Sequence, residues 1–214
     1  MAESVLATSV PAYSAEDFRR RAAGRVLSDF ADDDGDHRFS PENADLVRRH
    51  GLRAAAVLIP VVDRGREGSV ILTKRAETLR SHTGQVAFPG GRVDATDPDP
   101  EHAALRETRE EIGLDAGHIE IIGRMPDYLS GSGYRIAPVL GIVRPGFSLT
   151  INPHEVDAAF EVPLRFLMDP ANHARQSRSW GNREWAYYDM PYEGRRIWGV
   201  TAGIIRTLYE RLYL

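Results

Sequence analysis

The uninterrupted apolar run from Ala54 to Val62 is typical of a buried strand, which restricts the folds open to this chain. A turn at 63–68 leads from it to a second apolar strand at 69–73. A helical pattern follows at 98–112, so strands and helices are mixed along the chain. This mixture predicts an α/β layered fold with a mixed sheet.

Shorter patterns predict the remaining elements after residue 51. We expect strands at 119–122, 136–143 and 160–164, and a helical turn at 163–168. The segments 184–188 and 195–198 bracket a Pro191–Gly194 turn, which indicates a hairpin. A helix is expected from Val200 to the end. Leu105, Ile112 and the 119–122 run are assigned to the core.

Residues 1–50 read as a helical extension that precedes a main domain of residues 51–214. Ser14 is placed to cap a helix that begins at Ala15. Ser40 and Pro41 form a cap and first-turn pair for a second helix, which Gly51 would end. Both a dimer contact and a lid remain open as roles for this extension.

The acidic run Asp32–Asp36 resembles part of a calcium-binding loop, but its spacing fails. With Gly35 in the sixth place, Phe30 would be the first ligand, and no glutamate stands in the twelfth place. We therefore expect a solvated turn rather than a calcium site.

Composition excludes several classes of protein. The chain has no cysteine, so it has no disulfide, thiolate nucleophile or cysteine-bound zinc. Its net charge of −4 argues against a general nucleic-acid or membrane-surface binder. Its N-terminus lacks the features of a secretory signal and no run is long enough to span a membrane, so we expect a cytoplasmic protein.

Lys74 is the only lysine, which indicates either a coding bias or the use of arginine for phosphate groups.

Three glutamates converge on one side of the helix predicted at 98–112. Glu107 lies three residues before Glu110 and four before Glu111, near the C-terminus of the helix. Like charges at this spacing and at this end of a helix are unfavourable. A divalent magnesium or manganese ion would relieve the repulsion, since hard cations take carboxylate oxygens. An acidic solvated face, partly neutralised by Arg106 and Arg109, remains the alternative at this point.

The residues around these glutamates resemble the Nudix box, Gly-x5-Glu-x7-Arg-Glu-U-x-Glu-Glu-x-Gly-U, in which U is aliphatic. Two places depart from the pattern: Asp97 holds the first acidic place, with an eight-residue spacer after it, and Thr108 replaces an aliphatic residue. Asp97 is interpreted as a helix cap in preference to a metal ligand. The matching residues are Gly91, Arg106, Glu107, Glu110, Glu111, Gly113 and Leu114.

The resemblance implies a Nudix α/β/α sandwich and a Mg²⁺- or Mn²⁺-dependent hydrolase. It implies that Glu107 and Glu111 are the principal metal ligands, with Glu110 close by and the Gly90 carbonyl as a further ligand. Arg106 would orient the carboxylates by charge-assisted pairing. Metal-held water and neutralised phosphate oxygens suit the hydrolysis of a diphosphate.

The segment Ile71–Gly91 resembles the extended motif of the coenzyme A pyrophosphatase branch of this family, with Ile71 as the one changed position. The resemblance implies coenzyme A or its thioesters as the substrate, with 3′,5′-ADP and (acyl-)4′-phosphopantetheine as products. His82 is a further candidate for phosphate binding, although a turn-capping role is favoured. The basic residues expected to bind the phosphates are Lys74, Arg75, Arg80 and Arg92.

Glu155 is the preferred candidate for the general base, and His154 is the alternative. Two other functions remain open at this point: a Nudix hydrolase of ADP-ribose or another nucleoside diphosphate derivative, and a non-catalytic nucleotide-binding module. The expected partner is a small molecule, with no nucleic acid and no membrane, and a homodimer is possible.

Overall fold

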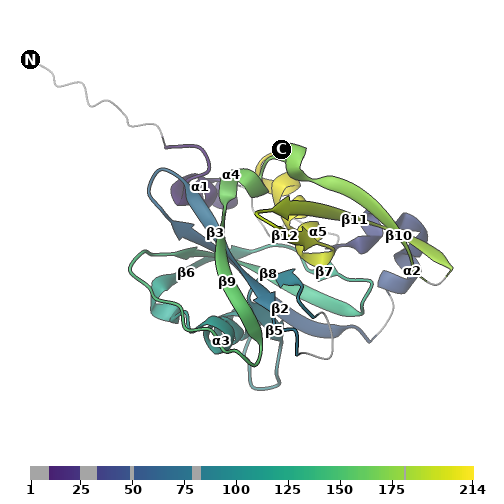
Figure 1. Ribbon diagram of the computed structural model, residues 1–214, viewed down its shortest axis with the longest axis horizontal. Helices are drawn as coiled ribbons and strands as arrows, with labels where there is room; N and C mark the ends of the chain where they lie inside the picture. The colour runs from purple at the N-terminus through teal and green to yellow at the C-terminus, as the bar shows by residue number, and fades with distance from the viewer. Residues whose placement is uncertain (1–9, 25–32, 49–50, 79–82, 181) are drawn as a thin grey trace, which may run out of the picture.

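A computed structural model describes residues 10–24, 33–48, 51–78, 83–180 and 182–214. Within these ranges the strands form a nine-stranded mixed sheet and a separate three-stranded sheet, with helices on both sides of the larger one (Figure 1). The larger sheet follows the order β1-β7-β8-β2-β3-β4, with β5, β6 and β9 paired to β2, β8 and β3. No helix in the described part of the chain is long and apolar enough to cross a membrane.

The centre of the large sheet is a parallel pair, β2 (Arg53–Asp63) and β8 (Tyr134–Val143). Antiparallel neighbours surround this pair, so the sheet is mixed as predicted. The other strands of this sheet are β1 (Asp34–Gly35), β3 (Gly68–Arg75), β4 (Val86–Ala87), β5 (Gly90–Arg92), β6 (Ile119–Arg124), β7 (Tyr128–Leu129) and β9 (Val156–Pro163).

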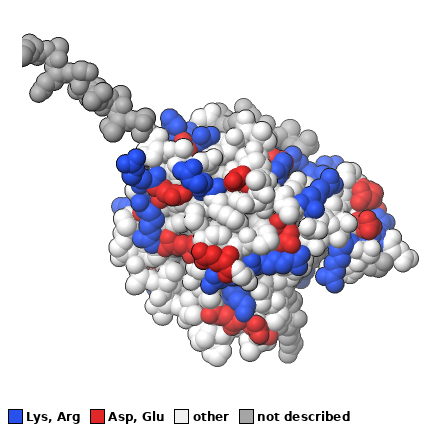
Figure 2. Space-filling model, turned by 45° about the horizontal axis from the view of Figure 1, so that its top comes forward, with Lys and Arg blue, Asp and Glu red and all other residues white. Residues whose placement is uncertain are grey.

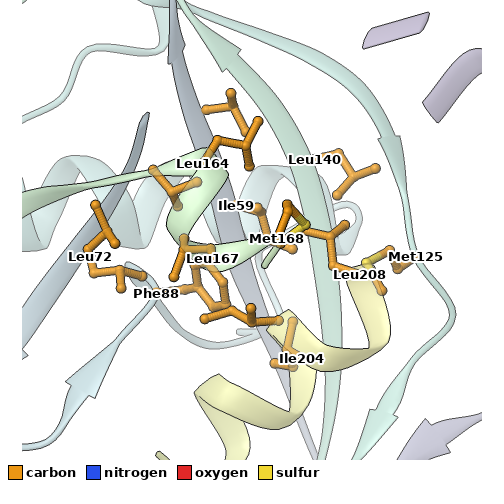
Figure 3. Close-up of a cluster of buried hydrophobic side chains, with 14 of the residues drawn as sticks. Ile59, Leu72, Phe88, Met125, Leu140, Leu164, Leu167, Met168, Ile204 and Leu208 are labelled. Carbon is orange, nitrogen blue, oxygen red and sulfur yellow. The ribbon is translucent and has the colours of Figure 1, made fainter. Parts of the chain in front are cut away.

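Alternate residues of β2 pack in two different cores, because successive side chains of a strand point to opposite faces. Ile59 and Val61 belong to the larger cluster, whereas Leu58 faces the opposite cluster with Ala103 of α3 (Pro100–Ile112). The larger cluster is covered by α1 (Ala15–Gly24), α4 (Leu164–Leu167) and α5 (Val200–Leu212), and Figure 3 shows its centre. The layers are therefore helix, sheet and helix, and the predicted α/β/α fold class is confirmed.

The N-terminal segment is helical in part. Ser14 Oγ accepts a hydrogen bond from Asp17 N at 3.1 Å, so the predicted cap of α1 is confirmed. The second predicted helix is wrong in length, because only a 3₁₀ turn at Pro41–Asn43 and one helical turn, α2 (Ala44–Val47), form. Ser40 does not cap them; its Oγ accepts a hydrogen bond from Ala186 N at 2.7 Å instead. The domain boundary at residue 50 remains a prediction.

The prediction of a solvated turn for the acidic run is wrong where the structure describes it. Asp34 is buried and contacts Arg38 at 2.6 Å and Arg211 at 2.7 Å. Asp36 accepts hydrogen bonds from Tyr128 Oη at 2.6 Å and from Gly131 N at 2.7 Å, and its burial raises its pKa. These acids therefore attach the N-terminal segment to the rest of the fold. Asp32 lies outside the described residues.

A small antiparallel sheet follows α4, built from β10 (Ala174–Trp180), β11 (Arg183–Tyr192) and β12 (Arg195–Trp198). The predicted hairpin is the β11–β12 pair, which turns at Glu193 and Gly194, both in left-handed conformation. The sequence patterns did not indicate β10, because its residues lack apolar alternation and are all exposed.

Candidate active site

Two adjacent glycines bring the strand β5 under α3. β5 pairs with β2 through Gly90↔Val57 and Gly91↔Ala56. Gly90 has φ +152°, and a Cβ there would lie 2.4 Å from the Ala56 carbonyl oxygen. A Cβ on Gly91 would lie 2.3 Å from Glu107 Oε2, so the carboxylate of Glu107 lies directly over the β5 backbone.

Helix α3 has well-defined ends, which fix the position of its acidic residues. Asp99 caps its N-terminus by accepting a hydrogen bond from His102 N at 2.8 Å, and Pro100 occupies the first turn. Gly113 ends it in the left-handed conformation, with φ 67°. The helix-cap interpretation of Asp97 is therefore wrong, because the cap is Asp99.

Asp97 instead pairs with Arg106, whose guanidinium joins three acidic residues. Arg106 Nε and Nη2 contact Asp97 at 3.0 and 2.9 Å, and Nη1 contacts Glu107 and Glu110 at 3.0 Å each. Arg106 is the first cause of the lowered pKa of Asp97, followed by the backbone hydrogen bond from Asp94. The guanidinium thus fixes two box carboxylates relative to the loop before the helix.

Glu111 is the most buried of the three glutamates, with only 2% of its surface exposed. Its Oε2 accepts a hydrogen bond from Gly90 N at 3.2 Å, and its Oε1 lies 3.7 Å from Arg75. Burial raises the pKa of Glu111 to about 7; Gly90 and Arg75 oppose this shift, whereas the charges of Glu107 and Glu155 add to it. Glu111 is therefore a buried carboxylate whose negative charge is only partly balanced by Gly90 N and Arg75.

Glu155 faces the same site from the loop before β9. Asn152 N donates to the Glu111 carbonyl at 2.8 Å, and Asn152 Nδ2 donates to Glu155 Oε1 at 3.2 Å. The pKa of Glu107 is raised, first by burial and then by the charges of Glu110 and Glu155, against the effect of Arg106. Glu155 thus acts electrostatically on both Glu107 and Glu111. His154, the alternative base, is exposed beside it.

The basic residues upstream of the box occupy different environments. Arg75 approaches Glu111, and the register of the β3–β9 pair shifts between Lys74 and Arg75. Lys74 pairs with acidic residues instead, Glu77 at 2.9 Å and Asp157 at 3.5 Å. Arg92 is exposed at the end of β5. Arg80 and His82 lie outside the described residues.

Two site features were missed by sequence reasoning. Asn152, which holds Glu155 to the end of α3, stands in the Asn-Pro turn just before that residue, and this turn was its only sequence signal. Thr108 departs from the aliphatic pattern of the box, yet it is fully buried and its hydroxyl donates to the Ala104 carbonyl at 2.7 Å. That hydrogen bond satisfies the polar group, so the threonine fits an apolar environment.

The chemistry of these donors fits a divalent metal ion. Within the described ranges, no three Asp, Glu or His side chains lie close enough together to coordinate a metal ion. Glu107 and Glu110 instead accept hydrogen bonds from Arg106 Nη1. Yet Glu111 is buried with weak compensation, and the charges of Glu107 and Glu155 act on it. A hard cation among these carboxylate oxygens would offset both the burial and the repulsion.

Charged residues of both signs are interspersed over the molecular face in Figure 2, without a continuous basic surface.

Comparison with known proteins gives the following matches. Residues 52–188 match the NUDIX domain. The chain is 44% identical over 161 residues to "Uncharacterized Nudix hydrolase NudL" of Escherichia coli (strain K12), covering 73% of this chain and 81% of that protein. It is 43% identical over 159 residues to the protein of the same name from Enterobacter sp. (strain 638), with the same coverage. A solved structure from Deinococcus radiodurans is 14% identical, covers 76% of this chain and 88% of its own, and superposes with a TM-score of 0.49.

Proposed function

This chain belongs to the Nudix hydrolase family, and we propose that it is a metal-dependent diphosphatase that cleaves coenzyme A or its thioesters. The observation that carries the hydrolytic part is the buried, partly compensated Glu111, on which the charges of Glu107 and Glu155 act. The proposed products are 3′,5′-ADP and 4′-phosphopantetheine, or the acyl form of the latter.

The residues proposed to hold Mg²⁺ or Mn²⁺ are Glu107, Glu110, Glu111 and the carbonyl of Gly90. When bound, such an ion supplies Lewis-acid neutralisation of phosphate oxygens and acidifies water. The protein contributes the fixed positions of the ligands: Gly91 leaves room for Glu107, and Gly90 N holds Glu111. Arg106 aligns Glu107 with Glu110, and its role is therefore that of a positioning residue.

Glu155 is the proposed general base. Its carboxylate is oriented by Asn152 and is close enough to shift the pKa of Glu107 and of Glu111. In this role Glu155 accepts the proton of the attacking water, which is the one proton that the hydrolysis requires to be removed. His154 is more exposed and has only a backbone contact to Asn152.

The substrate assignment is supported by the motif that connects β3 to β5. This segment leads directly into Gly90 and Gly91, and its residue Arg75 reaches Glu111. An arginine at the edge of the carboxylate site suits an anionic diphosphate. Lys74, Arg80, His82 and Arg92 are proposed to contribute to phosphate binding with Arg75.

The deciding experiment is incubation of the protein with coenzyme A, acetyl-coenzyme A, ADP-ribose and a nucleotide sugar, each with Mg²⁺ or Mn²⁺. Products are identified by mass spectrometry. We expect coenzyme A or its thioester to be cleaved with the highest kcat/KM. Rapid cleavage of ADP-ribose without turnover of coenzyme A would overturn the substrate assignment, and binding without turnover of any compound would indicate a non-catalytic module.

A further inference from the structure

The three tryptophans of this chain lie on one face of the small sheet. Directly paired residues of antiparallel strands point to the same side. Trp180 pairs with Arg183, Trp185 with Arg178, and Trp198 with Asp189. Every second residue of β11 points to the same side, so Tyr187 shares the face of Trp185 and Asp189. The β10–β11 pairing has no register shift, so the face is continuous.

This aromatic face is not part of the hydrophobic core. The opposite face of β11 is buried against the larger cluster through Ala186, Tyr188 and Met190. On the aromatic face, Trp185, Tyr187 and Trp198 are only half-buried. The face therefore presents ring surface outside the core, on a sheet that α5 supports from behind.

The aromatic face carries more positive than negative charge, although the whole chain is acidic. Its arginines are Arg178, Arg183 and Arg196, and its acid is Asp189; Arg183 also lies 3.6 Å from Asp45 of α2. Arg196 pairs with Asp189 at 2.7 Å, and its guanidinium lies 5.2 Å from the centre of the Trp198 ring. Two copies of this face would bring arginines together, so its charge favours an anionic ligand over a second copy of the chain.

Packing places β12, the strand that carries Trp198, beside the segment that leads into the candidate active site. β12 packs against β4, and Thr201 Oγ1, just after β12, donates to the Val86 carbonyl of β4 at 3.0 Å. From Ala87 to Gly90 the chain spans at most about 11 Å. A ligand held at Glu111 therefore has Trp198 within reach of its nucleoside part.

We propose that Tyr187 and Trp198, with Arg196 beside them, form the wall that binds the purine base of the substrate. This inference rests on the proposed function, because coenzyme A carries an adenine. The two rings lie 5.8 Å apart at 66°, so a base would stack on one ring and meet the other at an angle. The nearby guanidinium of Arg196 suits a ribose phosphate.

Trp180 provides a matched control on the same face. It is 78% exposed at the tip of the β10–β11 hairpin, which projects to one side in Figure 1. Along β11, its partner Arg183 is about 20 Å from Asp189, the partner of Trp198. A wall for one nucleotide beside β4 requires Trp198 and not Trp180, whereas a docking surface for a macromolecule would use both.

The test is calorimetric titration of the metal-free protein with 5′-AMP and with ribose 5-phosphate. We expect AMP to bind more tightly, and Trp198→Leu to weaken AMP binding by about 5- to 150-fold while leaving ribose 5-phosphate unchanged. Trp198→Phe, which keeps an aromatic ring, should retain most of the AMP affinity, and the unchanged ribose 5-phosphate binding of Trp198→Leu would show that this variant is folded. Trp180→Leu should bind AMP as the wild type does.

Equal binding of AMP and ribose 5-phosphate by the wild type would overturn the inference, whatever the turnover of coenzyme A. Unchanged AMP affinity in a folded Trp198→Leu variant would also overturn it, as would an equal loss in Trp180→Leu. If AMP binding depends on Trp198 but coenzyme A is not cleaved, the proposed substrate fails and the base-binding wall stands. If coenzyme A is cleaved, Trp198→Leu should raise KM with little change in kcat.

Discussion

The acidic residues of the N-terminal segment and those of helix α3 look alike in the sequence, but the protein compensates them differently. Asp34 is paired with Arg38 and Arg211, and Asp36 receives hydrogen bonds from Tyr128 and Gly131. Glu111 is as buried as Asp34, yet its closest cation, Arg75, is 3.7 Å away. The first group stabilises the fold, whereas we propose that the second binds a divalent cation.

The largest difference between the N-terminal acids and those of α3 should be in their effect on catalysis. Glu111→Gln should lower kcat at saturating Mg²⁺ by about 100-fold or more, because several kcal/mol of transition-state stabilisation depend on the bound metal. Glu107→Gln should act similarly. Glu101→Gln, in the first turn of the same helix, is the matched control and should retain activity. Near-normal kcat in both Glu107→Gln and Glu111→Gln would refute the metal assignment.

The N-terminal acids should instead determine stability. Asp34→Ala should lower the free energy of unfolding by about 3 kcal/mol, because the buried carboxylate loses its ion pairs with Arg38 and Arg211. Urea unfolding followed by circular dichroism measures this loss. The kcat of the folded fraction should stay close to that of the wild type. A large loss of kcat with unchanged stability would contradict the structural role assigned to Asp34.

The pH dependence of stability gives a further contrast. The pKa of Glu111 is raised from 4.5 to about 7, so the folded state binds this proton more tightly than the unfolded chain does. Its stabilising contribution is complete below about pH 4.5 and is lost as the pH rises through about 7.

Glu111→Gln removes this titration. In EDTA, the variant should gain stability over the wild type between pH 5 and pH 8, by about 2 to 3 kcal/mol, from a shift of about 1.36 kcal/mol per pKa unit. Urea unfolding at a series of pH values measures the difference. If the free energies of unfolding of the two proteins changed in parallel with pH, the pKa of Glu111 would not be raised in the metal-free state.

The smallest effect is expected from the positioning arginine. Arg106→Lys should weaken Mn²⁺ affinity or activity by about 10-fold, because one ammonium group cannot make the contacts to Asp97, Glu107 and Glu110 together. Metal titration monitored by activity measures this change. Arg109→Lys, at an exposed position of the same helix, should have no effect. Equal losses in both variants would indicate that helix charge matters, rather than alignment of the ligands.

The sequence predicted the structure best where a local pattern of residues determines which side chains share a face. The apolar run of β2 predicted a buried strand, and the helical spacing predicted that Glu107, Glu110 and Glu111 all lie on α3. Here periodicity alone determines which side chains share a face.

Prediction was poorest where the partner is distant in the chain. The role of Asp34 depends on Arg211, 177 positions away, and that of Asp36 on Tyr128 and Gly131, 92 and 95 positions away. No local pattern shows which charges will meet across such separations. Asp97 was interpreted as a cap for a different reason: it stands just before the helix, but the cap is Asp99 and Asp97 pairs with Arg106.

The long-range pairing of Asp34 has a consequence for the order of folding. Its ion pair with Arg211, and the hydrogen bond from Arg21 Nη1 to the Leu212 carbonyl at 3.1 Å, close only after α5 has been synthesised. Such contacts carry a large loop-closure cost and form late. During translation these two contacts therefore form after those of Asp36 with Tyr128 and Gly131, and α5 completes the docking of α1.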